Sequence, residues 1–194
     1  MVKLIGKIKI NTAVFISGKG SNLKSLIKYS KEKKSEIKLV LVITNNKKAA
    51  GLKYSKQSNI KSLIVPYSNK KFAEKKILKI ISQNKIKLVC LAGFMKILSN
   101  KFISNFKYPI LNIHPSLLPK YKGLNTHERV IRNKEKYTGC TVHLVSKKLD
   151  SGRIIMFKKL KVYKNDTKLT LKNRILKHEH LLYPEAVSKF CSNL

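Results

Sequence analysis

The sequence predicts an α/β fold in which helices cover both faces of one open, doubly wound, mostly parallel sheet. Strand-like and helix-like segments alternate over the first two thirds of the chain. Residues 37–44 and 88–91 are almost unbroken apolar runs, as expected for parallel strands that are buried on both faces. The 194 residues show no repeat, low-complexity tract or linker, so we expect residues 1–194 to form a single domain.

Each early element is marked by its apolar period and by the polar, Gly or Pro residues that end it. The predicted strands lie at residues 8–16, 37–44, 62–65 and 88–91. The predicted helices follow residue 22 and cover residues 49–57, 70–84 and 99–106. In the 70–84 helix we expect one buried face, formed by Phe72, Ile77, Leu78 and Ile81.

The sheet is predicted to be completed by a buried strand at residues 110–113 and by a pair of later strands. Residues 139–145 alternate, with Thr141 and His143 on one face, which predicts a half-buried antiparallel strand. Residues 154–162 are expected to pair with it.

Two later helices are predicted. One runs from Thr126, its expected N-cap, to about residue 133, with His127 in its first turn. A long terminal helix is expected to be capped by Asp166 or Thr167. Its predicted apolar face consists of Leu171, Ile175, Leu182, Ala186, Val187 and Phe190.

The composition limits the classes of protein to which the chain can belong. No apolar run reaches the roughly 18 residues of a membrane helix, and Lys3, Lys7 and Lys9 interrupt the apolar start that a secretory signal needs. The cysteines are odd in number and lack CxxC spacing, which predicts a reducing compartment, the cytoplasm, without structural disulfide or metal. We expect each to be a small buried side chain: Cys90, Cys140 and Cys191.

The formal charge of +34 raises the question of a nucleic-acid partner. Of 43 basic residues only four are arginines, so 43 − 4 = 39 are lysines, and they are spread along the whole chain. Specific readout of bases and phosphates favours arginine. We therefore interpret the charge as a solvated basic surface with weak non-specific polyanion binding, which could also attract phosphorylated substrates.

A glycine loop follows the first predicted strand. Gly18 and Gly20 precede Ser21 and Asn22, and a helical period begins at Leu23. Such a loop can present backbone N–H groups to a phosphate at a helix N-terminus. The loop lacks the third Gly of a dinucleotide site and the Gly-Lys-Ser/Thr of a triphosphate loop, so it favours one phosphomonoester. A simple tight turn between strand and helix is the alternative.

The stretch at residues 111–119 offers the first candidate for catalysis. Asn112 and His114 lie two residues apart, so they point to the same side of a strand that Pro115 helps to end. In an open α/β sheet, reactive groups lie beyond the carboxyl ends of the strands. A structural His held by its own loop is the alternative.

Asp150, in the loop between the last two predicted strands, is the candidate charge partner of His114. A nearby carboxylate should raise the pKa of His114 toward or above neutrality. Together with Asn112, this set suits attack on a carbonyl, whose oxyanion needs donors. Because no Ser or Cys occupies a nucleophile-elbow pattern, we expect direct transfer without a covalent enzyme intermediate.

Four blocks, in order along nearly the whole chain, resemble the phosphoribosylglycinamide formyltransferase family. They are Gly-Lys-Gly-Ser-Asn at 18–22, Leu-Ala-Gly-Phe-Met-Lys-Ile-Leu at 91–98, residues 111–119 followed by Gly123, and Leu-Asp-Ser-Gly at 149–152. The resemblance implies a Rossmann-like formyltransferase fold with a late antiparallel strand. It also implies formyl transfer from 10-formyltetrahydrofolate to the amine of glycinamide ribonucleotide, in purine synthesis.

The resemblance also implies roles for individual residues. His114 would act as an imidazolium, Asn112 as an oxyanion donor and Asp150 as the group that holds and charges His114. The residues implied to bind the ribonucleotide are Gly18, Gly20, Ser21, Asn22 and Glu179. Those implied to bind folate are Lys70, Met95, Lys96, Ile97, Leu98 and Asn112. Residues up to about 105 would hold the phosphate, and about 90–155 would carry the folate and catalytic loops.

Some positions depart from the family pattern, and related enzymes remain alternatives. Lys96 replaces an Arg, Ser151 replaces a Gly, and Lys70 lies near a position where the family often has an Arg. Methionyl-tRNA formyltransferase and formyltetrahydrofolate hydrolase have related loops but normally carry an additional domain. A non-catalytic polyanion-binding protein is the alternative from another class. We expect small-molecule substrates, no specific nucleic acid, no membrane partner, no metal, and a monomer or weak homodimer.

Overall fold

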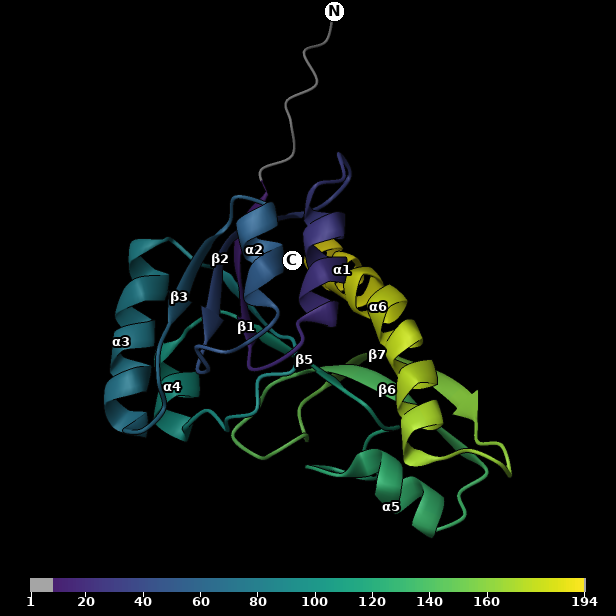
Figure 1. The fold of residues 1–194 in the computed structure, drawn as a ribbon. Helices are drawn as coiled ribbons and strands as arrows, with labels where there is room; N and C mark the ends of the chain where they lie inside the picture. The colour runs from purple at the N-terminus through teal and green to yellow at the C-terminus, as the bar shows by residue number, and fades with distance from the viewer. Residues whose placement is uncertain (1–8, 194) are drawn as a thin grey trace, which may run out of the picture.

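A computed structural model describes residues 9–193 of the chain, in which seven strands form one sheet with the order β3-β2-β1-β4-β5-β6-β7 (Figure 1). The strands are β1 Ile10–Ile16, β2 Ile37–Thr44, β3 Lys61–Ile64, β4 Leu88–Leu91, β5 Ile110–His114, β6 Tyr137–Leu144 and β7 Ile154–Lys161. The helices are α1 Ser21–Ser30, α2 Leu52–Gln57, α3 Lys70–Gln83, α4 Asn100–Asn105, α5 Thr126–Arg132 and α6 Lys168–Ser192. The predicted start of the first strand, Ile8, and the predicted interruptions Lys3 and Lys7 lie outside the described residues.

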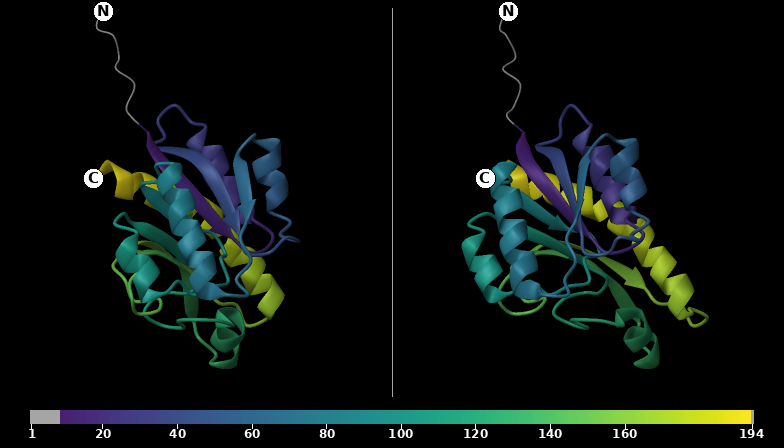
Figure 2. Two further views of the ribbon diagram at one scale, coloured as in Figure 1. Left: turned by 90° about the vertical axis from the view of Figure 1, so that its left-hand side faces the viewer. Right: turned by 60° about the vertical axis from the view of Figure 1, so that its left-hand side comes forward.

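Both faces of the sheet are covered, as expected for a doubly wound fold. Helices α1, α2 and α6 pack on one face, and α3 and α4 pack on the other (Figure 2). Alternate residues of β1 divide between the two cores: Val14 and Ile16 face α1 and α6, and Ala13 and Phe15 face α3. This explains why the central strands are continuous apolar runs.

The strand β6 runs antiparallel to both of its neighbours, β5 and β7. The predicted late antiparallel strand is therefore confirmed, and so is its pairing with the following strand. The parallel strands meet between β1 and β4, where the chain order reverses. Loops at such a reversal diverge and leave room for a ligand at the carboxyl edge of the sheet.

The long helix α6 packs against the sheet and is hydrogen-bonded to two of its central strands. All six residues of its predicted apolar face are buried, and Thr167 caps it through a capping box with Thr170. Tyr183, which is fully buried, donates its hydroxyl toward the carbonyl oxygens of Leu91 (3.1 Å) and Leu111 (3.0 Å). The same helix therefore covers the core and links β4 to β5 one residue before Asn112.

Three predictions about local structure are wrong. Phe72 is 72% exposed, because it lies five residues, or about 140° of helix rotation, from the buried Ile77. Thr126 is the first helical residue of α5 rather than its N-cap, which is Asn125 in a left-handed conformation. The strand β6 is buried on both faces, because the 115–121 loop covers its polar side, where Thr141 bonds to Ser116.

The three cysteines are buried, as predicted: Cys90, Cys140 and Cys191. Within residues 9–193, none of the helices combines the length and apolarity that a bilayer crossing requires.

The loop after β1 predicts a specific sensitivity to substitution. Gly20 has φ +71°, and a Cβ there would lie 2.5 Å from the Cα of Gly51, whereas a Cβ at Gly18 would meet nothing within 4 Å. We expect Gly20→Ala to lower the free energy of unfolding by about 2 kcal/mol or more. Gly18→Ala should change it by less than about 1 kcal/mol. Urea unfolding measures both, and equal losses would contradict this account of the loop.

Candidate active site

The antiparallel pairing of β5 with β6 brings the candidate catalytic residues together. Asn112 lies opposite His143 and His114 lies opposite Thr141 in the ladder, and Asp150 follows from the connection to β7. Asp150 Oδ2 lies 3.5 Å from His114 Nδ1, and its Oδ1 lies 3.6 Å from His143 Nε2. Asn112 Nδ2 lies 3.2 Å from His143 Nε2. One carboxylate thus faces two imidazole rings.

Each imidazole is also fixed by a backbone carbonyl. His114 Nε2 lies 2.8 Å from the carbonyl oxygen of Tyr121, and His143 Nδ1 lies 2.8 Å from that of Leu144. A carbonyl only accepts, so these two nitrogens carry protons. The opposite nitrogens, His114 Nδ1 and His143 Nε2, are those that face Asp150. A proton gained at either nitrogen therefore has an acceptor in place.

The carboxyl group of Asp150 stays ionised. Burial alone would raise its pKa. The contact with His143 Nε2, which becomes a hydrogen bond when that nitrogen is protonated, acts against this, together with the Gly123 N–H (2.9 Å) and the charge of His114, and the pKa is held at about 2. Asp150 has φ +44°, so its backbone is held in the left-handed region. Lys122 Nζ donates to Ser151 Oγ at 2.6 Å, which further ties this loop to the one after His114.

The prediction that Asp150 raises the pKa of His114 above its usual value is wrong in its net direction. Burial lowers the pKa of His114, and His143 and Arg129 lower it further; the Tyr121 carbonyl and Asp150 raise it, but by less. His114 is 6% exposed, so desolvation of its cationic form dominates. In the free protein His114 is therefore neutral at pH 7.

His143 belongs to this cluster, and the sequence interpretation does not identify it. Its signal was present, because Thr141 and His143 were placed on one face of an antiparallel strand. Pairing that strand directly with residues 110–113 would have set His143 opposite Asn112. What the sequence could not supply was which strand would be its neighbour.

The glycine loop has the geometry of a helix N-terminus that is open to an anion. Gly20 is the N-cap of α1, and the N–H groups of Ser21 and Asn22 begin the helix without intrahelical acceptors. Gly18 is exposed, and its carbonyl accepts from the Gly51 N–H at 3.0 Å. The tight contact between Gly20 and Gly51 fixes the direction in which this first turn points.

Asn22 and Glu179, far apart in the sequence, are in direct contact. Asn22 Nδ2 donates to Glu179 Oε2 at 2.6 Å, and both residues are buried. Burial raises the pKa of Glu179, although Asn22 and Lys172 act against this. The side-chain carbonyl of Asn22, Nδ1 of His127 and Nε2 of His180 are buried without a hydrogen-bond partner among the described residues.

The segment at 94–98, which follows β4, presents an apolar surface beside the candidate catalytic strand β5. Met95 is 67% and Ile97 63% exposed, Lys96 is exposed, and Leu98 is buried. The Met95 N–H donates to Ser17 Oγ at 2.8 Å, so it is already bonded within the protein. Apolar side chains exposed next to polar groups are typical of a small-molecule site.

Lys70 is exposed at the first position of α3. The loop before it contacts the 94–98 segment, because the Tyr67 and Phe94 rings pack edge to face with centroids 5.5 Å apart. The structure therefore brings the Lys70 loop to the proposed folate segment but records no contact of Lys70 itself. Within residues 9–193 there is no group of three or more His, Cys, Asp or Glu that could hold a metal ion.

Comparison with known proteins gives a consistent result. Residues 10–187 match the formyl transferase family. Phosphoribosylglycinamide formyltransferase of Escherichia coli is 35% identical over 184 residues, covering 93% of this chain and 87% of its own length. The trifunctional purine biosynthetic protein adenosine-3 of Homo sapiens is 39% identical over 189 residues, and the match covers 96% of this chain.

The chain spans about a fifth (19%) of the length of that trifunctional relative. Among solved structures, phosphoribosylglycinamide formyltransferase of Coxiella burnetii superposes with a TM-score of 0.89 and 39% identity, covering 95% of this chain and 88% of the other. The structure of phosphoribosylglycinamide formyltransferase of Brucella melitensis superposes with a TM-score of 0.90 and 38% identity, covering 96% of this chain and 97% of the other. The chain therefore belongs to the formyl transferase family.

Proposed function

We propose that this protein transfers a formyl group from 10-formyltetrahydrofolate to the amine of glycinamide ribonucleotide. The products are formylglycinamide ribonucleotide and tetrahydrofolate, a step of purine biosynthesis. The observation that carries the proposal is the single ionised carboxylate, Asp150, placed between His114 and His143 beside Asn112. The relatives that are named for this activity and matched over most of their own length support it.

The two substrates would approach this cluster from opposite sides. The phosphate would bind the N–H groups of the loop at Gly18, Gly20, Ser21 and Asn22, with Glu179 turned toward the rest of the ribonucleotide. Since the Asn22 side chain is bonded to Glu179, its backbone N–H is the better phosphate donor. The folate would lie against Met95, Lys96, Ile97 and Leu98, with Lys70 at the edge.

The chemistry follows from a neutral His114. The amine nitrogen attacks the formyl carbon, and the carbonyl oxygen becomes an oxyanion that the remaining N–H of Asn112 can bind. His114 accepts the amine proton at Nδ1, and the resulting imidazolium is stabilised by Asp150 and by the carbonyl of Tyr121. The bond to folate N10 then breaks, and N10 takes the proton. His114 is therefore cationic only while the oxyanion exists.

We propose one domain for residues 1–194, in which about 1–105 hold the phosphate and about 90–155 carry the folate and catalytic loops. We also propose a cytoplasmic monomer or weak homodimer that acts on small molecules and needs no metal. Formylation of methionyl-tRNA and hydrolysis of formyltetrahydrofolate are less favoured, because the relatives described above are named for neither reaction.

Replacing His114 tests the assignment directly. His114→Ala should lower kcat for formyl transfer to glycinamide ribonucleotide by about a thousandfold, because it removes the proton acceptor. Binding of the polyanion heparin should be unchanged, since one buried neutral side chain is lost from a strongly basic surface. Steady-state kinetics measure the first effect. If the wild-type protein formylates methionyl-tRNA but not the ribonucleotide, the proposal is wrong.

The pH dependence tests the role of Asp150. Because the pKa of His114 lies below its usual 6.5, kcat/KM should fall only as the pH drops below about 6.5, where His114 becomes protonated in the free enzyme. Asp150 raises this pKa, so Asp150→Asn should move the acid limb to lower pH while reducing kcat about a hundredfold or more.

Asp166→Asn is the matched control for that experiment. It removes the same charge from the start of α6, where Asp166 pairs with Arg174. It should leave the acid limb of kcat/KM in place. An acid limb that moves equally in both variants, or upward in Asp150→Asn, would rule out the proposed charge pairing.

A further inference from the structure

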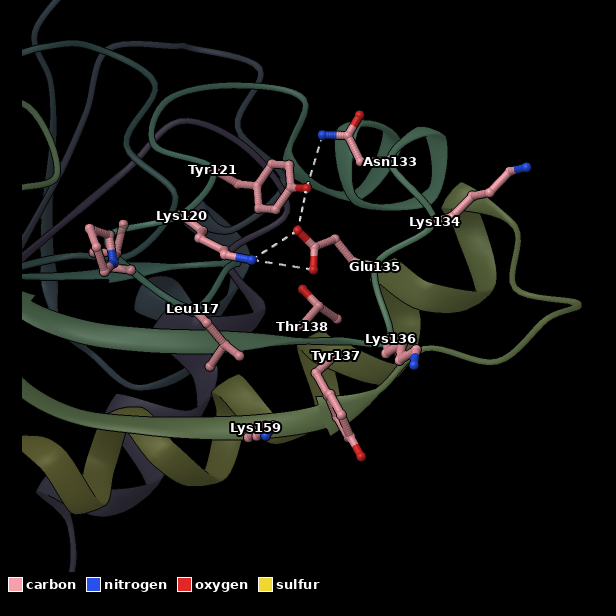
Figure 3. Close-up of a pocket in the computed structure, with 12 residues that line it drawn as sticks. Leu117, Lys120, Tyr121, Asn133, Lys134, Glu135, Lys136, Tyr137, Thr138 and Lys159 are labelled. Atoms are coloured by element: carbon pink, nitrogen blue, oxygen red, sulfur yellow. Dashed lines mark hydrogen bonds and ion pairs between the residues drawn. The ribbon is translucent and has the colours of Figure 1, made fainter.

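A hollow lies next to the candidate active site, between the loop that follows His114, the turn after α5 and the strand β7 (Figure 3). Its volume of about 660 Å³ falls in the range of small-molecule sites. We call it the lysine hollow and define it by Leu117, Lys120, Tyr121, Glu135, Lys136, Tyr137, Thr138 and Lys159, which line it.

A buried hydroxyl without a partner lies in the lysine hollow. Thr138 is 2% exposed, and its Oγ1 has no hydrogen-bond partner among residues 9–193. Figure 3 shows this side chain in the middle of the lining residues, below Glu135. A buried polar group left unpaired costs about 1–3 kcal/mol, so Thr138 points to a polar ligand that would bond to it.

The charge of the hollow indicates what kind of ligand it would bind. Glu135 is the acid among the lining residues, and it is already bonded by Lys120 Nζ (3.1 Å) and by the Tyr121 hydroxyl (2.8 Å). Lys136 and Lys159 add positive charge, and Lys159 Nζ lies 4.0 Å from the centre of the Tyr137 ring. Lys134 extends away from the hollow (Figure 3). The remaining positive charge favours an anion with several charges.

We propose that the lysine hollow binds a di- or triphosphate group, free or as part of a nucleotide. Lys136 and Lys159 bind the phosphate oxygens, and the Thr138 hydroxyl donates to one of them. The Tyr137 ring, 48% exposed, provides a surface on which a base could stack. This site is separate from the loop at residues 18–22 and does not depend on the proposed formyl transfer.

The lysine hollow also borders the group that holds His114. The Tyr121 hydroxyl donates to Glu135 and accepts from Asn133 Nδ2 (3.0 Å), while its backbone carbonyl accepts from His114 Nε2. Tyr121 has φ +56°, so its backbone is held in a conformation that a non-glycine residue rarely adopts. A ligand beside Lys120 and Glu135 therefore lies one residue from the carbonyl that fixes the catalytic imidazole.

Calorimetric titration of the whole protein with inorganic tripolyphosphate, at about 0.15 M salt, tests the proposal. Two double variants with the same loss of charge are compared: Lys136→Ala/Lys159→Ala in the hollow, and Lys75→Ala/Lys79→Ala on exposed turns of α3 at the far end of the sheet (Figure 1). The hollow variant should weaken binding about tenfold or more, and the α3 variant less than about twofold. Equal weakening in the two variants, or a dissociation constant of the wild type above about 1 mM, would overturn the proposal.

A third variant tests the buried hydroxyl. Thr138→Val keeps the shape of the side chain and removes the unpaired group, so the protein should fold normally while binding weakens about threefold. Unchanged affinity in Thr138→Val would contradict the proposed contact and overturn the assignment to this hollow. Replacing tripolyphosphate by ATP separates the two sources: tighter binding of ATP assigns a nucleotide through Tyr137, and equal binding assigns the phosphate chain alone.

Discussion

The candidate active site depends on one shared carboxylate. Asp150 faces one ring nitrogen of each of two imidazoles, His114 and His143, and the other nitrogen of each ring is anchored by a backbone carbonyl. Burial makes protonation of His114 unfavourable, and the charge of Asp150 partly compensates for this. A group of this kind can take up a proton while an oxyanion forms and release it when the oxyanion collapses.

The reversed strand β6 is what makes that arrangement possible. The strands β4 and β5 run parallel, so their carboxyl ends lie at the same edge of the sheet. Because β6 runs the other way, its His143 lies across from Asn112 rather than at the far edge, and its exit loop returns Asp150 to the same place. Tyr183 of α6 bonds to the last residue of β4, Leu91, and to Leu111 near the start of β5, and so stabilises the strand that ends at His114.

The sheet, most of the helices and the glycine loop could be predicted from the sequence, because short local patterns of residues indicate them. The apolar runs of the central strands and the glycine loop at residues 18–22 are local signals, and they predicted the sheet, the helices and the loop correctly. Burial was harder: the polar face of β6 reads as solvent-exposed, although the 115–121 loop covers it. The predicted direction of the His114 pKa shift was wrong for the same reason, because the desolvation of a side chain depends on the packing of segments distant in the sequence. His143 was not identified, because its place beside Asn112 follows only from the pairing of β6 with β5.

The most direct test of the account is the protonation of the two imidazoles in the free protein, followed by ¹⁵N NMR of the histidine ring nitrogens from acid to neutral pH. We predict that His143 keeps a proton on Nδ1 throughout and that His114 keeps one on Nε2, with its Nδ1 titrating below pH 6.5. A His114 that is still cationic above neutral pH, or that carries its neutral-form proton on Nδ1, would contradict the proposed role of His114 as the proton acceptor.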